Sequence, residues 1–195
     1  MLLRNWFLVN HLAQAITIVT TFLTVNLHPI DSVSYRLSQV PAFLIIMTFT
    51  LSIENLCFLV YAVYQFARSQ TQLILFVFAV STSTLGWTIV VSFNNPTVTL
   101  YHTSGVGLFM AGYLGMVSLL YLNKAPLSLV YLLSVASTVA AALAYIFFYF
   151  QDSYNIAYPI EWVALFSYSL SATVFLLEAD FEAVTDAYEL SYDKA

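Results

Sequence analysis

The stretch Tyr101–Ser118 reads Y-H-T-S-G-V-G-L-F-M-A-G-Y-L-G-M-V-S and holds four of the five glycines of the chain. A small residue recurs in it every four positions, at Thr103, Gly107, Ala111 and Gly115. This spacing predicts one smooth face of a helix, on which a second helix backbone can pack closely. His102, one of three histidines, gives the stretch a polar head. Such a stretch is typical of a helix inside a membrane bundle.

The composition agrees with a membrane setting. Of the 195 residues, 61% are hydrophobic and only 8% are charged, and the mean hydropathy is +0.86. A soluble domain carries about 25% charged residues, so this chain has too few charges to cover a surface in water. There is no basic patch, and we therefore expect no nucleic-acid partner. The net charge of −5 is concentrated at the end, because six of the ten acidic residues lie in the last 18 positions.

Six stretches are long and apolar enough for membrane helices, which need about 20 residues each. The predicted spans are 6–27, 41–66, 72–93, 99–122, 126–149 and 159–178. The first is kept as a helix because it contains polar residues and lacks a cleavage site of the signal-peptide type. The sequence thus predicts an all-α, polytopic integral membrane protein with one six-helix domain over 1–178, followed by an acidic cytoplasmic tail over 179–195.

Five basic residues indicate the orientation. With both termini in the cytoplasm, four of them fall inside (Arg4, Arg68, Lys124 and Lys194) and only Arg36 falls outside. The positive-inside rule therefore favours cytoplasmic termini.

Glu54 is the most unusual charge, because it lies near the centre of the second span beside Asn55. An ionised carboxylate at that depth costs at least about 2.5–3.5 kcal/mol. One interpretation is a proton or cation site. The favoured alternative is a neutral carboxyl that is hydrogen-bonded to a neighbouring helix, alongside Asn55.

Two further faces predict packing rather than chemistry. The first span has polar residues on one face, at Asn10, Gln14, Thr17, Thr21 and Thr24. They would line a water path or, as we prefer, bond to other helices. The fifth span has small residues at four-residue spacing, at Ser134, Thr138 and Ala142 and at Ala136, Ala140 and Ala144. With only a short turn before it, this span is expected to pair closely with the fourth.

An outer polar cluster is the best candidate site. At similar depth this topology places His28, Asp31, His102, Ser104, Glu161 and Trp162. A set of His, Asp and Glu residues could bind a ligand or act as acid and base, but interhelical contacts near the head groups are the preferred interpretation. No HExxH, HxH or activated-serine motif is present, and Ser104 lies on a different helical face from His102. We therefore expect no catalytic residue, no metal and no cofactor.

Several motifs occur together in a recognisable order. They are Leu27-His28-x-Ile30-Asp31, Asn55, Leu85-Gly86-x-x-Ile89-Val90-x-x-Phe93, His102-x-Ser104-Gly105, and Glu161-Trp162 with Phe166 and Thr173 after it. This order resembles the DRAM family, the damage-regulated autophagy modulators, and its lipid-remodelling and phosphoinositide-regulating relatives. The resemblance implies a six-helix protein of the endolysosomal or plasma membrane, linked to autophagy or to lipid homeostasis. Glu54, next to the family-like Asn55, is peculiar to this chain.

The leading hypothesis is a non-catalytic regulator or accessory subunit. Its partners would be membrane lipids and membrane proteins that dock on the small-residue faces. Two alternatives remain: a lipid-handling enzyme or scramblase that uses the outer His/Glu cluster, and a proton- or cation-coupled transporter centred on Glu54.

Overall fold

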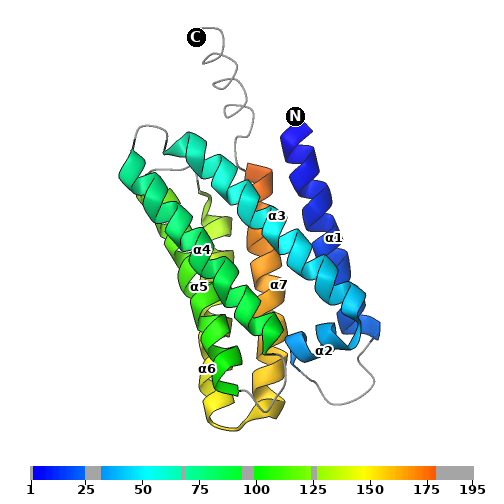
Figure 1. The fold of residues 1–195 in the computed structure, drawn as a ribbon. Coiled ribbons are helices and arrows are strands. Elements are labelled where there is room, and N and C mark those ends of the chain that lie inside the picture. Colours follow the sequence, from blue (N-terminus) through cyan, green and yellow to red (C-terminus); the bar gives the residue numbers. More distant parts are fainter. Residues whose placement is uncertain (1, 25–31, 67–68, 94–98, 124–126, 179–195) are drawn as a thin grey trace, which may run out of the picture.

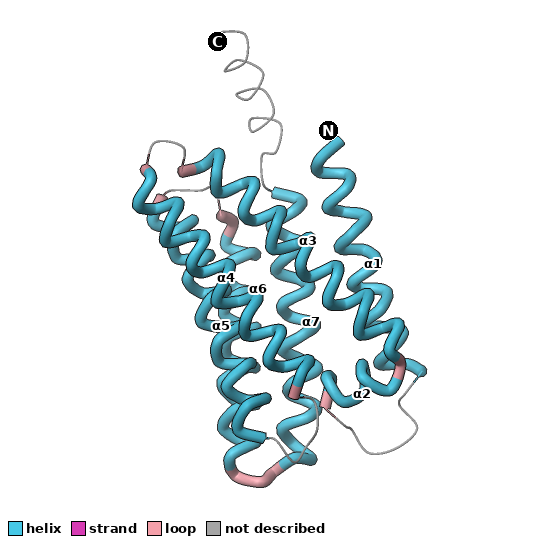
Figure 2. The backbone as a smooth tube through the Cα atoms, viewed as in Figure 1, coloured by secondary structure: helices cyan, strands magenta, loops and turns pink. Residues whose placement is uncertain are grey.

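A computed structural model describes residues 2–24, 32–66, 69–93, 99–123 and 127–178. These residues form seven helices: α1 Leu2–Thr24, α2 Val33–Gln39, α3 Pro41–Gln65, α4 Gln70–Ser92, α5 Thr99–Leu122, α6 Leu129–Phe150 and α7 Tyr154–Glu178. Helix makes up nearly all of the described chain (Figure 2). All of the helices except α2 are long and apolar enough to cross a membrane. The six predicted spans are therefore confirmed as helices, and the chain is that of an integral membrane protein. His28, Asp31 and the acidic tail lie outside the described residues.

The helices form one bundle in which α7 lies between α1 and α6 (Figure 1). The first residue of α1 and the last of α7 lie at the same end, as six crossings require (Figure 1). We call this the terminal end and the opposite one the α2 end. Which end faces the cytoplasm stays a prediction from the positive-inside rule.

Helix α7 begins earlier than the sequence predicts. Its expected start, Pro159, lies inside the helix, which begins at Tyr154. A proline in the interior costs a backbone hydrogen bond because its ring nitrogen carries no hydrogen. The contacts of the long apolar helix outweigh this loss.

Helix α2 is not predicted by the sequence, because seven residues are too few for a span. Ser32 caps it by accepting a hydrogen bond from the Tyr35 backbone N–H at 3.2 Å. Its Val33 and Leu37 side chains are buried. The short helix lies across one end of the bundle (Figure 1) and contacts α3, α4 and α7.

Helices α4 and α5 pack more closely than any other pair, and glycines permit this. A Cβ added at Gly86 would lie 2.6 Å from the Gly105 carbonyl oxygen, and one at Gly112 would lie 2.5 Å from the Ala79 carbonyl oxygen. Both distances are too short for any side chain, so the two backbones are in direct contact. Glycine provides this approach in membrane helices, where tight packing replaces the hydrophobic effect.

This contact does not follow the predicted seam. Gly105, Phe109 and Gly112 face α4, whereas Ala111 is exposed and a Cβ added at Gly107 would meet no atom within 4 Å. The reason is helical geometry: each four-residue step overshoots a turn of 3.6 residues by about 40°. Over three steps the seam wraps about a third of the way around α5. Thr103 and Gly115 consequently lie at the edges of the buried face, with the other two residues outside it.

The expected close pairing of α5 with α6 was wrong as well. Helix α6 packs mainly on α7, and its contact with α5 is slight. Ser134, Thr138 and Ala142 are buried, while Ala136 and Ala140 point outward. A short connecting turn therefore makes α5 and α6 consecutive in the chain without making them the closest pair.

Candidate functional site

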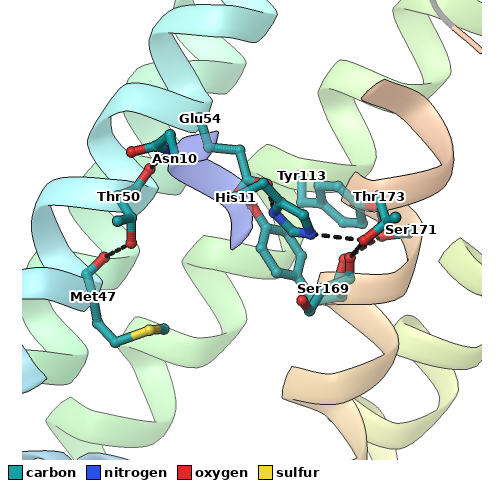
Figure 3. A network of polar contacts seen from close by, with 10 residues as sticks. Asn10, His11, Met47, Thr50, Glu54, Tyr113, Ser169, Ser171 and Thr173 are labelled. Atoms are coloured by element: carbon teal, nitrogen blue, oxygen red, sulfur yellow. Dashed lines mark hydrogen bonds and ion pairs between the residues drawn. The ribbon is translucent and has the colours of Figure 1, made fainter. Parts of the chain in front are cut away.

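A buried polar network occupies the middle of the bundle, where α1, α3 and α7 meet (Figure 3). The His11 Nδ1 atom lies 2.9 Å from Glu54 Oε1, and its Nε2 atom lies 2.7 Å from the Thr173 hydroxyl. The Tyr168 hydroxyl donates to Glu54 Oε2 at 3.2 Å. His11 and Glu54 are 4% and 2% exposed. Glu54 is thus bonded to two other helices, as the favoured alternative expected.

The hydrogen bonds determine how many protons the His11–Glu54 pair holds. The Thr173 hydroxyl donates to the Ser169 carbonyl oxygen at 2.8 Å, so it must accept from His11 Nε2, which therefore carries a hydrogen. The Nδ1 atom then either carries a second hydrogen and faces a carboxylate, or accepts one from a neutral Glu54. In both cases one proton lies between His11 and Glu54. The pair has no net charge, which explains how a carboxyl group is accommodated at this depth.

Hydroxyl groups extend the network from α7 to α5. The Ser171 hydroxyl donates to the Tyr168 carbonyl oxygen at 2.7 Å and accepts from the Tyr113 hydroxyl. The Tyr131 hydroxyl is buried, and no described group bonds to it. Cys57, a buried thiol, lies one turn from Glu54 on α3.

The polar residues on this face of α1 differ in the hydrogen bonds that they make. Asn10 donates to the Thr50 carbonyl oxygen at 2.9 Å, which is the predicted kind of interhelical bond. Thr17 and Thr21 instead donate to carbonyl oxygens of α1 itself. Gln14 is 0% exposed, and within the described chain neither of its amide atoms has a hydrogen-bond partner. The Thr24 side chain is not among those that the structure describes.

Asn55 does not join Glu54. Its Nδ2 atom donates to the Thr84 hydroxyl of α4 at 3.0 Å. Adjacent residues on a helix point about 100° apart, so the two predicted partners serve different helix interfaces.

Two described members of the outer cluster, His102 and Glu161, lie close together. His102 Nε2 lies 3.7 Å from Glu161 Oε1, and the second carboxylate oxygen accepts from the Val33 backbone N–H at 3.0 Å. The His102 Nδ1 atom lies 3.3 Å from the Val90 carbonyl oxygen, and it must donate there because a carbonyl only accepts. Helix α2 thus contributes a backbone donor that no sequence motif indicates.

The two remaining members of the cluster that the structure describes, Ser104 and Trp162, make their contacts elsewhere. Ser104 is exposed and donates to the Leu100 carbonyl oxygen of its own helix at 2.7 Å. Trp162 is buried and its ring packs edge-on against Phe22, at 5.3 Å between centroids. Among the described residues, no group of three His, Cys, Asp or Glu side chains could hold a metal ion.

A cavity of about 70 Å³ lies beside Glu161 of the outer pair. Its wall includes Glu161 and the rings of Trp87, Phe109, Tyr145 and Tyr168. Tyr168 therefore links the regions, since its ring borders the cavity and its hydroxyl bonds to Glu54. The Tyr145 hydroxyl is buried without a partner in the described chain.

Sequence reasoning missed His11 and Tyr168 as partners of Glu54, and Thr173 as the partner of His11. His11 itself is visible as a rare intramembrane titratable residue. Which helix face it would meet depends on packing, which hydropathy does not reveal.

Comparisons with protein-family models, with characterised proteins and with solved structures found no match to this chain. The resemblance to the DRAM family therefore stays a prediction based on the motifs.

Proposed function

We propose that this protein is a non-catalytic regulator or accessory subunit in a membrane. One observation carries the proposal: the two carboxyl groups in the interior of the described spans, Glu54 and Glu161, are both held by groups from other helices of the same chain. The hydrogen bonds of these two carboxyl groups therefore hold helices of the bundle together. The motif resemblance favours a regulated process in autophagy or in lipid and phosphoinositide homeostasis, at the endolysosomal or plasma membrane.

The proposed partner surface is the outward face of α5. Gly107 and Ala111 leave room there for a second helix backbone, and small residues support such contacts between membrane helices. Neither residue is needed for the close packing of α4 on α5. The surface is therefore open to a membrane protein partner.

Gly107→Leu tests this role. The new side chain enters open space, so the bundle should fold normally while partner docking is blocked. Ala13→Leu, at an exposed position on α1, is the matched control. After mild-detergent purification, we expect a stoichiometric partner with wild type and Ala13→Leu but not with Gly107→Leu. The same variant should fail to restore autophagic flux or phosphoinositide levels in cells that lack the protein. Full rescue by Gly107→Leu without a bound partner would reject the proposal.

A lipid-handling activity at His102 and Glu161 has less support. Catalysis by such a pair requires a nucleophile or a bound water in reach, and Ser104 points away. His102→Ala tests the alternative: a folded variant with normal lipid turnover excludes it.

A further inference from the structure

We propose that His11 and Glu54 form a binding site for a single proton, and that this proton holds α1 against α3 and α7. The inference goes beyond the regulatory role proposed above, because it concerns what the buried pair binds rather than what docks on α5.

Geometry selects a proton over a metal cation. The His11 Nδ1 and Glu54 Oε1 atoms are in direct contact at 2.9 Å. A metal ion in a protein site takes four or more ligand atoms, and among the described residues no group of three His, Cys, Asp or Glu side chains could supply them. A proton shared along one hydrogen bond fits that separation.

The site tolerates only one proton. Without it, a carboxylate would face the lone pair of a neutral imidazole, since Thr173 keeps the other ring hydrogen on Nε2. With a second proton, the pair would carry an uncompensated positive charge. Both states are costly in a low-dielectric interior. The state with one proton is neutral and satisfies every nitrogen and oxygen of the pair.

The other titratable groups around the pair do not supply a compensating charge. They are Cys57 on α3, Tyr113 on α5, Tyr131 on α6 and Tyr168 on α7, and each is buried. Tyrosine and cysteine are neutral in such surroundings. Arg4, the basic residue of α1, lies at the terminal end and donates to the Leu177 carbonyl oxygen at 3.2 Å.

Helix α1 is the element that loss of this proton would release. His11 joins it to α3 through Glu54 and to α7 through Thr173. Its opposite side is exposed along its length, at Trp6, Val9, Leu12, Ile16, Val19 and Leu23. Gln14, buried without a partner in the described chain on the same inner face, gains hydrogen bonds as soon as water enters. Loss of the proton therefore favours an opened, hydrated α1 interface.

Cys57 offers a natural probe of this opening, because it is the single cysteine of the chain and is 1% exposed. The rate of its alkylation by a small uncharged reagent is measured against pH in detergent micelles. Each rate is divided by that of the denatured protein at the same pH, which removes the effect of thiol ionisation. For opening linked to the loss of one proton, the normalised rate should rise about tenfold per pH unit on the alkaline side.

Glu54→Gln and Glu161→Gln form the decisive pair of variants. In Glu54→Gln, the new amide donates to His11 Nδ1 and still accepts from Tyr168, but it does not titrate. We expect the alkaline rise to vanish in Glu54→Gln and to persist in Glu161→Gln.

Three results would overturn the proposal: a flat wild-type profile, a rise that survives in Glu54→Gln, or a rate that depends on replacing sodium with potassium at fixed pH. None of these concerns partner docking, so the proton site and the α5 surface are tested separately.

Discussion

The described part of the bundle contains two histidine–glutamate pairs that differ in how the carboxyl group is held. In the inner pair, Glu54 touches His11 at 2.9 Å and accepts from a tyrosine hydroxyl. In the outer pair, Glu161 accepts from a backbone N–H of α2 and lies 3.7 Å from His102. The inner carboxyl depends on a side chain that shares its proton, whereas the outer one is held mainly by the backbone. The same two residue types therefore do not predict the same role.

The largest difference should follow removal of the two histidines. His11→Leu leaves Glu54 buried without its proton-sharing partner, and breaking a buried pair in this way costs about 3–5 kcal/mol. His102→Leu removes two longer contacts, to Glu161 and to the Val90 carbonyl oxygen, while the Val33 bond to Glu161 remains, so we expect a loss of about 1 kcal/mol. Unfolding by SDS titration in mixed micelles measures both. Equal losses would show that the pairs are equivalent.

The sequence was sufficient to predict the membrane spans, but it did not indicate which side chains contact Glu54. Length and hydropathy define a membrane helix residue by residue, and for this reason α3, α4 and α5 end close to their predicted limits. The partner of Glu54 depends on the rotation of α1 relative to α3. The prediction that Gly107 and Ala111 would lie in a close helix contact failed for the same reason. A small rotation of a helix about its axis moves a residue from a helix contact to the lipid.

The outer cluster shows a second limit of sequence reasoning. His102 and Glu161 do lie near each other, as their similar depth predicted. The donor that holds Glu161 is a backbone N–H of α2, and side-chain identity carries no information about it. Helix α2 has only seven residues, too few to be recognised by periodicity.

Val33→Pro tests that backbone bond. Proline has no N–H to donate, yet it is well tolerated at the first position of a helix, which Val33 occupies in α2. Ser32 has φ −60° and ψ 148°, a conformation compatible with a following proline. We expect a loss of about 1–3 kcal/mol from the unsatisfied carboxylate, measured by the same SDS titration. Val33→Ala is the control for the lost apolar contact, and a proline variant no less stable than it would contradict the assignment.

Thr173→Val tests the hydrogen bond between Thr173 and His11 in the inner pair. The substitution removes the acceptor that keeps a hydrogen on His11 Nε2, and it should destabilise the bundle by about 1 kcal/mol. Thr88 also donates to a carbonyl oxygen of its own helix, but it is exposed on α4. Thr88→Val should therefore change the stability little. If both variants behave alike, Thr173 does not orient the imidazole.

The smallest effect, and the most selective one, is expected at Tyr168, which reaches both regions. Its hydroxyl bonds to Glu54, while its ring borders the cavity near Glu161. Tyr168→Phe should cost about 0.6 kcal/mol, an average value for a hydrogen bond between membrane helices. A double-mutant cycle separates the two contacts, because only groups that interact directly fail to add.

In that cycle, Tyr168→Phe is combined with Glu54→Gln and, separately, with Glu161→Gln. The energetic coupling should involve Glu54 alone, since no hydrogen bond joins Tyr168 to Glu161 within the described chain. Tyr121→Phe, at a residue that is 61% exposed, sets the background for the loss of a tyrosine hydroxyl. Coupling to Glu161 of similar size would mean that the cavity transmits polar interactions between the pairs. The inner and outer regions would then have to be treated as one connected network rather than as two sites.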